Sequence, residues 1–250
     1  MEVGSSKLDA QSITGLQDLG IDKLKTADCP LKTACPSAAF AEAGTLNIED
    51  CTKMLNEKLK HHNIILASGS PRRQQFFKDL GLDFEIRLKP VHEEYPPRLT
   101  HFEISDYLAQ LKALPFKKEL KPNDILITSD TIVWLKKKAL GKPRDAKEAF
   151  EIIKSLSNAT HEVITSVCFT TPTYEKTVNA VTKVTFKDFS DDEINYYIRT
   201  CKPYDKAGAY GIQEWIGHIG VTKIEGSYFN VMGLPTHLVY ETLNDMVKII

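Results

Sequence analysis

The chain carries almost no net charge and has no long apolar run. Its 32 Lys and Arg nearly balance its 33 Asp and Glu, for a formal net charge of -1, so the whole molecule has no charge-driven affinity for nucleic acid or an anionic membrane. No stretch approaches the ~20 apolar residues that a membrane-spanning helix needs. The start, from Met1 to Ser6, lacks the basic residues and apolar run of a secretory signal. We therefore expect neither a nucleic-acid nor a membrane partner.

Cysteine is also scarce. The chain has five cysteines and no C-x-x-C pair, which argues against a zinc site and against a disulfide framework. A reducing, cytoplasmic location is the simplest expectation. The five are Cys29, Cys35, Cys51, Cys168 and Cys201.

Large side chains are rare in the first 62 residues, where Phe40 is the only aromatic. Such a segment buries too little apolar area to form a core of its own. Weak helical patterns cover 13–24 and 48–59. We interpret residues 1–62 as an extension that is flexible or loosely helical, with a functional module as the alternative. Residues 63–250 form the expected folded domain.

From Asn63 onward, apolar runs typical of buried strands alternate with helical patterns. Ser70-Pro71 is typical of a helix start, and Ser190 to Glu193 forms a capping box. The expected strands are 64–67, 83–88, 125–128, 132–135, 162–170 and 176–186. The expected helices are 71–80, 104–120, 145–156, a short one after 190, and 235–247. This order predicts an α/β domain around a mixed sheet.

The segment from Ser68 to Arg73 is the first candidate site. A strand that ends in small residues and enters a helix exposes free backbone N–H groups at the positive end of the helix dipole, where an anion is favoured. Arg72 and Arg73 would add bidentate phosphate donors. A capped surface helix, or a phosphorylation site, would also account for this pattern. The segment is not a Walker loop, because G-x-x-x-x-G-K-[ST] is absent.

Asp130 directly follows an apolar strand. A carboxylate at the carboxyl end of a buried strand faces the crevice where α/β sheets bind ligands. There it could hold Mg²⁺, orient a water or act as a general base. A turn cap is the alternative. The Asp-x-Asp pattern of a haloacid-dehalogenase-type phosphatase is absent, because Ile132 stands at the third position.

Three further segments carry candidate residues. Gly141-Lys142-Pro143 precedes a helix and would hold Lys142 as a positioned charge, or would be a loop corner with a solvated lysine. The stretch from Asp205 to Gln213 is dense in small residues, and the Gln213 amide could recognise a base edge. The acids after His92 could complete a metal site or form a solvated loop.

The order of these motifs is more informative than any one of them. It closely resembles the Maf family of nucleotide pyrophosphatases, over 63–250 and not over the first 62 residues. The resemblance implies a mixed twisted β-sheet flanked by helices, with a central active-site cleft of the Maf/inosine triphosphate pyrophosphatase kind. The motifs are Ser68-Gly69-Ser70-Pro71-Arg72-Arg73, Glu93, Lys112, Asp130-Thr131, Gly141-Lys142-Pro143, Asp205 to Gln213, and Gly226 to Pro235.

The resemblance also implies roles for individual residues. The activity is hydrolysis of a nucleoside triphosphate to a monophosphate and pyrophosphate, with Asp130 as proton acceptor and metal ligand and Glu93 as the other metal ligand. The expected cofactor is a divalent cation, Mg²⁺ first, with Mn²⁺ or Co²⁺ as alternatives, and the expected assembly is a homodimer. The implied phosphate-binding residues are Ser68, Arg72, Arg73, Lys112 and Lys142.

The subfamily acting on dTTP and UTP carries Gly-Ile-Gln and Gly-Ser-Tyr-x-Asn-Val, and both are present here. Arg72, Thr131 and Gln213 are then the specificity positions, for dTTP, UTP or a modified pyrimidine nucleotide. Two positions depart from the family pattern: His92, where the family usually has an acid, and Glu214, where glycine is commoner. The alternative function is that of a regulatory or binding protein affecting cell division, with a vestigial nucleotide site.

Overall fold

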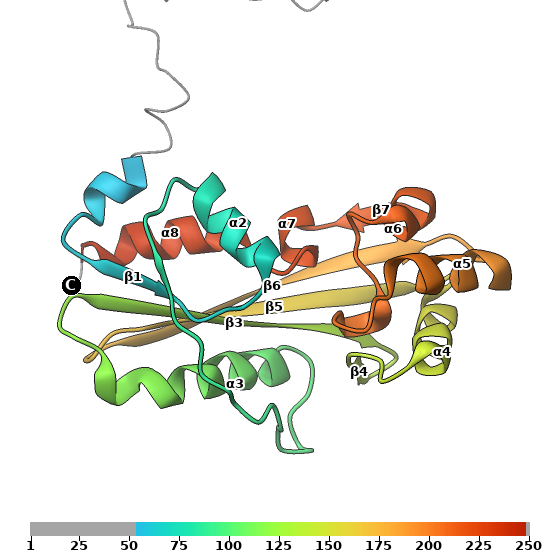
Figure 1. The fold of residues 1–250 in the computed structure, drawn as a ribbon, viewed down its shortest axis with the longest axis horizontal. Coiled ribbons are helices and arrows are strands. Elements are labelled where there is room, and N and C mark those ends of the chain that lie inside the picture. The colour runs from blue at the N-terminus through green and yellow to red at the C-terminus, as the bar shows by residue number, and fades with distance from the viewer. Residues whose placement is uncertain (1–53, 249–250) are drawn as a thin grey trace, which may run out of the picture. The chain divides into compact units, whose positions relative to one another are not determined.

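The computed structural model describes residues 54–248, which are built on a seven-stranded mixed β-sheet (Figure 1). The predicted helix over 13–24, and the first part of the one over 48–59, lie outside the described residues. The strands are β1 (Asn63–Leu66), β2 (Glu85–Ile86), β3 (Asp124–Leu135), β4 (Lys138–Leu140), β5 (Thr160–Thr170), β6 (Glu175–Phe186) and β7 (Val221–Glu225). The α-helices are α2 (Pro71–Asp79), α3 (Phe102–Ala113), α4 (Ala146–Leu156), α5 (Asp191–Cys201), α6 (Trp215–Gly220), α7 (Tyr228–Val231) and α8 (Thr236–Met246). Two 3₁₀ helices, η2 (Leu114–Glu119) and η3 (Ala207–Ala209), complete the elements.

The sheet has the strand order β2-β1-β3-β5-β6-β7, with β4 also paired to β3. β1 runs parallel to β2 and β3, whereas β3, β5, β6 and β7 pair antiparallel. The expected α/β domain around a mixed sheet is therefore confirmed.

One strand differs from its prediction in a way that matters for the site. β3 runs unbroken from Asp124 to Leu135, although the polar run Ser129-Asp130-Thr131 suggested a loop between two strands. Asp130 is therefore inside a strand and not beyond its carboxyl end, so that expectation was wrong. The register explains why polar residues are tolerated there. β1 pairs with β3 only as far as Ile127, and the pairing of β3 with β4 starts only at Val133. Among the described residues, no strand therefore adjoins the edge of β3 between these two points.

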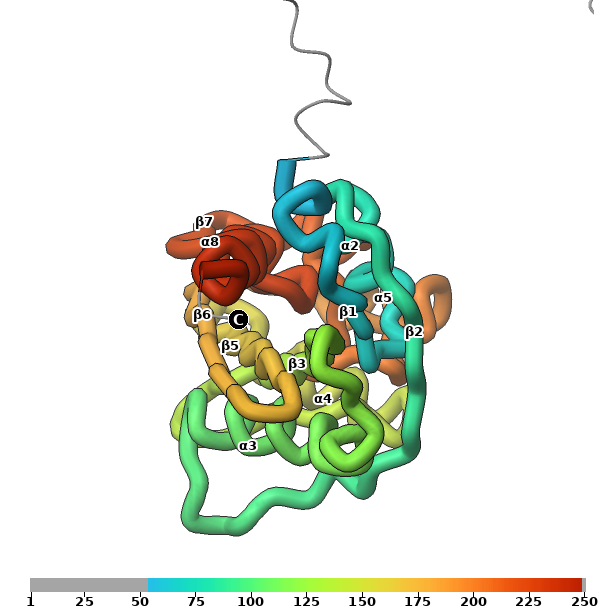
Figure 2. The backbone as a smooth tube through the Cα atoms, turned by 90° about the vertical axis from the view of Figure 1, so that its left-hand side faces the viewer, coloured from blue at the N-terminus to red at the C-terminus, as the bar shows by residue number. Residues whose placement is uncertain are grey.

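The two faces of the sheet are covered by different helices (Figures 1 and 2). On one face α3 packs its Ala109 and Ala113 against Leu126. On the opposite face, α2 and α8 contribute Phe77 and Val239 to a cluster of buried residues. Consecutive strand residues point to opposite faces, so these clusters use alternate positions of β3.

Local signals placed several elements correctly. Asp145 caps α4 by accepting the backbone N–H of Glu148, and Ser190 forms the predicted capping box with Glu193 at α5. Gly81 follows α2 with a φ of 67°, as a glycine at this position commonly does. The predicted strand over 83–88 is shorter than expected, because only Glu85–Ile86 pairs with β1.

Residues ahead of Asn63 also enter the core. A helical segment over 54–58 precedes β1, and the side chains of Leu55 and Leu59 are each only 1% exposed. They pack in the same cluster as Phe77 of α2 and Leu243 of α8. None of the helices described is long and apolar enough to cross a membrane.

Candidate active site

A cavity of about 360 Å³ opens beside the unpaired edge of β3. It is lined by seven of the residues predicted from the sequence: Ser68, Arg72, Arg73, Lys112, Asp130, Thr131 and Lys142. A smaller cavity of about 170 Å³ is lined by Glu93 and shares Ser68, Arg73 and Lys112 with the first. Of the predicted site residues only Gln213 lines neither. The fold thus gathers segments that are far apart in the sequence around one opening.

The loop over 67–70 joins β1 to α2 at this opening, and Arg72 lies in the first turn of α2. The Ser68 hydroxyl is buried and accepts the backbone N–H of Ser70 at 3.3 Å. Ser70 is the N-cap residue, as predicted, but its own side chain makes no capping bond. Pro71 occupies the first turn, and the N–H groups that follow it have no carbonyl partner within the helix. The loop and the first turn of α2 therefore offer backbone donors and the Arg72 side chain to the cavity.

All three hydrogen bonds of the Arg73 guanidinium group go to other groups of the protein. Its Nε donates to the carbonyl of Gly233 at 2.8 Å, Nη1 to the carbonyl of Ser129 at 2.9 Å and Nη2 to Oγ1 of Thr131 at 3.0 Å. The Ser129 carbonyl belongs to the β3 edge that lacks a strand partner. Burial lowers the pKa of Arg73, and the nearby carboxylate of Asp130 partly offsets this. Arg73 thus clamps α2, β3 and the Gly233 loop together.

Two carboxylates share one lysine. Lys112 of α3 places its Nζ 2.6 Å from Oδ1 of Asp130 and 3.1 Å from Oε1 of Glu93. Burial raises the pKa of Asp130, against the lowering effect of Lys112 and Arg73. Burial also acts to raise the pKa of Glu93, but the Lys112 ammonium holds it below its ordinary value overall. The structure therefore brings the predicted acids together on the α3 side of the sheet.

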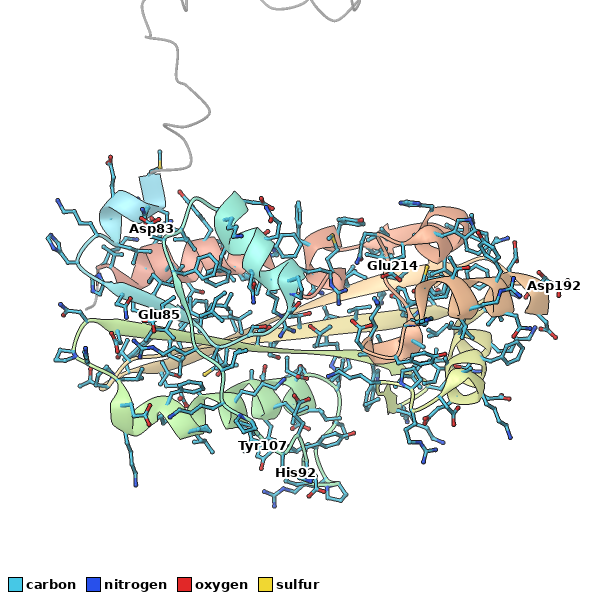
Figure 3. All side chains as sticks on the ribbon, viewed as in Figure 1. Asp83, Glu85, His92, Tyr107, Asp192 and Glu214 are labelled. Atoms are coloured by element: carbon cyan, nitrogen blue, oxygen red, sulfur yellow. The ribbon has the colours of Figure 1, made fainter. Side chains whose placement is uncertain are left out.

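These acids bear on whether a metal fits. Within residues 54–248 no three His, Cys, Asp or Glu side chains gather closely enough to hold an ion by themselves. Asp130 and Glu93 nevertheless lie within hydrogen-bond distance of one nitrogen. Mg²⁺ is commonly bound by one or two carboxylates, with substrate phosphates and water completing the shell. The donor set fits such an ion. His92 has a 79% exposed side chain beside Glu94 (Figure 3), so it adds no ligand here.

Thr131 follows Asp130 in β3 and points to the other face. Its hydroxyl receives the Nη2–H of Arg73 and lies 2.9 Å from Oγ1 of Thr165. Thr165 donates its only hydroxyl hydrogen to the carbonyl of Asn230 at 3.0 Å. Thr131 must therefore donate to Thr165, because a hydroxyl has a single hydrogen. What Thr131 has left for a ligand is acceptor capacity alone.

Apolar side chains also line the cavity. The cavity wall on this side includes Val133 and Val163, a cross-strand pair, together with Tyr210 and Met232. The Tyr210 hydroxyl is 2.7 Å from Nε2 of the buried His161. The cavity is thus polar and cationic beside Asp130 and apolar beyond Thr131.

Comparison with known proteins identifies the family. A family model described as Maf-like protein matches residues 63–246. The chain belongs to the Maf family. The dTTP/UTP pyrophosphatase of Flavobacterium johnsoniae is 68% identical to this Maf protein, over 78% of this chain and 100% of the relative. The dTTP/UTP pyrophosphatase of Flavobacterium psychrophilum is 58% identical, over 75% of this chain and 96% of the relative. The Ham1 protein of Staphylococcus aureus aligns with a TM-score of 0.43 and 17% identity, over 74% of this chain and 99% of that structure.

In this Maf protein the segment from Asp205 to Gln213 contributes residues that were not singled out from the sequence. Asp205, Lys206 and Tyr210 line the cavity, whereas Gln213 does not. The segment comes close to β3 at Gly208, whose φ is 69° and where an added Cβ would lie 2.7 Å from Val133. The Asp-Lys-Ala-Gly sequence was the available clue to Lys206. Which of its side chains face a ligand depends on a backbone path that spacing does not fix.

Proposed function

We propose that this Maf protein hydrolyses dTTP and UTP, or a modified pyrimidine nucleotide, to the nucleoside monophosphate and pyrophosphate. The observation that carries the proposal is the single cavity in which Arg72, Lys112 and Lys142 surround a buried carboxylate, Asp130. The names of the two Flavobacterium relatives support the same substrates. Triphosphate hydrolysis needs positioned charge and an oriented water more than covalent chemistry. The cavity supplies the charge, and the Asp130 carboxylate could orient the water.

In the proposed reaction a water attacks the α-phosphorus, and the bond from that phosphorus to the oxygen bridging to the β-phosphorus breaks. Asp130 takes the proton of the water, and the electron pair of the broken bond leaves on pyrophosphate. Arg72 and Lys142 neutralise charge on the leaving group. The raised pKa of Asp130 makes its carboxylate a stronger base than an exposed aspartate.

Asp130 and Glu93 would hold the divalent cation, with Mg²⁺ as the expected ion and Mn²⁺ or Co²⁺ as alternatives. Bound there, the cation would offset phosphate charge near the attacked phosphorus. Lys112 contacts both acids, so its ammonium would lie beside the ion and could also contact the phosphates that share it. Arg73 sets the geometry of the surrounding loops and adds positive charge.

The hydrogen bonds of Thr131 favour uracil or thymine as the base of the substrate. A hydroxyl that can only accept repels phosphate oxygens, which have no hydrogen to donate, but accepts the N3–H of uracil or thymine. Cytosine presents an unprotonated N3 and loses this bond. We therefore expect CTP and dCTP to be hydrolysed at least about tenfold less efficiently in kcat/KM, because a polar group in the site is then left unpaired. Equal kcat/KM for CTP and UTP would contradict this assignment.

Asp130→Asn tests the reaction itself. Loss of a general base typically costs 10²–10⁴-fold, so we expect pyrophosphate release to fall by about that factor while the circular dichroism spectrum is unchanged. Asp245→Asn is the matched control, since Asp245 is exposed on α8 and, among residues 54–248, forms an ion pair only with Lys248. Near wild-type release by Asp130→Asn would show that another group is the base. Nucleotide binding without release by the wild type would favour the regulatory alternative. The homodimer and the cytoplasmic location remain predictions.

A further inference from the structure

Glu214 immediately precedes α6 and lies near α5 and α6 (Figure 3). It does not line the cavity, yet its carboxylate contacts two side chains of different elements. It accepts a hydrogen bond from the Tyr197 hydroxyl of α5, and its Oε1 is 3.1 Å from Nζ of Lys206. Tyr197 is fully buried, and Lys206 is 9% exposed. Glu214 therefore links the rigid α5 to a lysine in the cavity wall.

The surrounding backbone is shaped to this carboxylate. The Tyr197 hydroxyl also accepts the backbone N–H of Gly211 at 3.1 Å, and Glu214 closes a turn by donating its own N–H to the Gly211 carbonyl at 3.0 Å. A Cβ on Gly211 would lie 2.8 Å from the Glu214 carboxyl carbon. The absence of a side chain at Gly211 is what lets the carboxylate reach both partners.

Lys206 has three N–H donors. One contacts Oδ1 of Asp205 at 2.8 Å and another contacts Glu214. The two carboxylates are not equivalent, because the Asp205 side chain is 66% exposed whereas that of Glu214 is 24% exposed. Glu214 is thus the sheltered partner. Without Glu214, the remaining partner of Lys206 would be Asp205, whose carboxylate is exposed to solvent.

We propose that Glu214 is a positioning residue that fixes Lys206 with one N–H left for a phosphate oxygen of the substrate. The proposal rests on the proposed function for the identity of that phosphate. Removal of Glu214 has two opposing effects on anion binding: it removes a negative charge and it frees the lysine. Lys206 lines the cavity and Glu214 does not, so we expect the loss of an oriented, charge-assisted hydrogen bond to outweigh the lost repulsion.

The test is a double-mutant cycle on the full chain, with inorganic tripolyphosphate as the probe and calorimetry as the measurement. We expect Glu214→Ala to weaken tripolyphosphate binding about tenfold, the worth of one charge-assisted hydrogen bond. In a Lys206→Met background the same change should have no further effect, because residues that act through each other are not additive. Glu225→Ala is the control, since Glu225 is exposed and its one ion pair within the described part of the chain is with Lys223.

Tighter binding by Glu214→Ala, unchanged binding, or an equal loss in both backgrounds would each overturn the proposal. If Glu214→Ala does not fold, Glu214→Gln keeps an oxygen for Tyr197 and removes the charge facing Lys206, and the same cycle applies. With dTTP as substrate, KM should rise several-fold while kcat changes less, because the lysine binds phosphate rather than moving a proton. Tripolyphosphate binding needs no turnover, so a wild-type protein that binds the probe but releases no pyrophosphate would count against the proposed function alone.

Discussion

Arg72 and Arg73 are neighbours in α2 but differ in their contacts, and replacing each by methionine separates their roles. Arg73→Met removes the donors to the Ser129 carbonyl, the Gly233 carbonyl and the Thr131 hydroxyl. Methionine keeps much of the apolar stem, so packing changes little. An orphaned acceptor costs about 1 kcal/mol where water can still reach it. These three acceptors adjoin the cavity, so the free energy of unfolding should fall by about 3 kcal/mol.

Urea unfolding followed by fluorescence measures this loss. The midpoint should drop while the slope with denaturant stays unchanged, which is the behaviour of altered stability at constant exposed area. Arg72→Met is the matched control. Arg72 lines the cavity, and within the described residues its side chain makes no hydrogen bond or ion pair. Its stability should stay within about 0.5 kcal/mol of the wild type, while its KM for dTTP rises.

The opposite pattern would refute this division of roles. If Arg73→Met unfolded at the wild-type urea concentration but bound tripolyphosphate much more weakly, Arg73 would be a phosphate ligand and its three contacts would contribute little. If Arg72→Met lost stability and kept its KM, Arg72 would have a structural role and would not contact the substrate. Both stability and ligand binding must be measured, because loss of the structural contacts of Arg73 would also lower activity.

Two other residues give predictions of stability. Burial lowers the pKa of His161 to about 4, so between about pH 6.5 and 4 the unfolded chain binds a proton that the folded chain does not. The contribution of His161 to the free energy of unfolding should therefore be fully present above pH 6.5 and should fall by about 2–3 kcal/mol on acidification to pH 4. Urea titrations at several pH values measure this slope, and His161→Gln should lack it. An unchanged slope would show that the pKa of His161 is the same in the folded and the unfolded chain. Gly208→Ala adds a Cβ at a positive φ and 2.7 Å from Val133. The substitution should lower the free energy of unfolding by about 2–4 kcal/mol, which thermal melting measures. If the loop moves to make room for the Cβ, KM should rise instead.

Much of the fold followed from local patterns. Ile64 to Ala67, the Asp145 cap and the Ser190 capping box each placed an element correctly. The error at β3 has a physical cause: a polar triplet ordinarily ends a strand, but here Asp130 and Thr131 face a cavity rather than a packed core. Nothing in the local sequence distinguishes those two environments.

The candidate site was harder to predict in detail than in outline. Ordered motifs named seven of the residues that line the larger cavity, but two adjacent arginines look alike until their partners are known. Lys112 was assigned to phosphate, and only the structure shows that it also joins Asp130 to Glu93. Glu214 looked like a departure from the family pattern, and its connection to Tyr197 and Lys206 depends on contacts between α5 and a distant loop.

The arrangement of Asp130 and Thr131 accounts for how one strand serves two ends of a nucleotide. Consecutive side chains of β3 point to opposite faces, so the carboxylate meets Lys112 on the α3 side while the hydroxyl meets Thr165 and Arg73 on the other. A substrate can touch both only by passing the edge of the sheet, and that edge is open because β1 ends at Leu66 and β4 ends at Leu140, opposite Val133. The short first strand is therefore a requirement of the proposed chemistry. A longer β1 would cover this edge, and the substrate could then no longer reach Asp130 with its phosphates and Thr131 with its pyrimidine base at the same time.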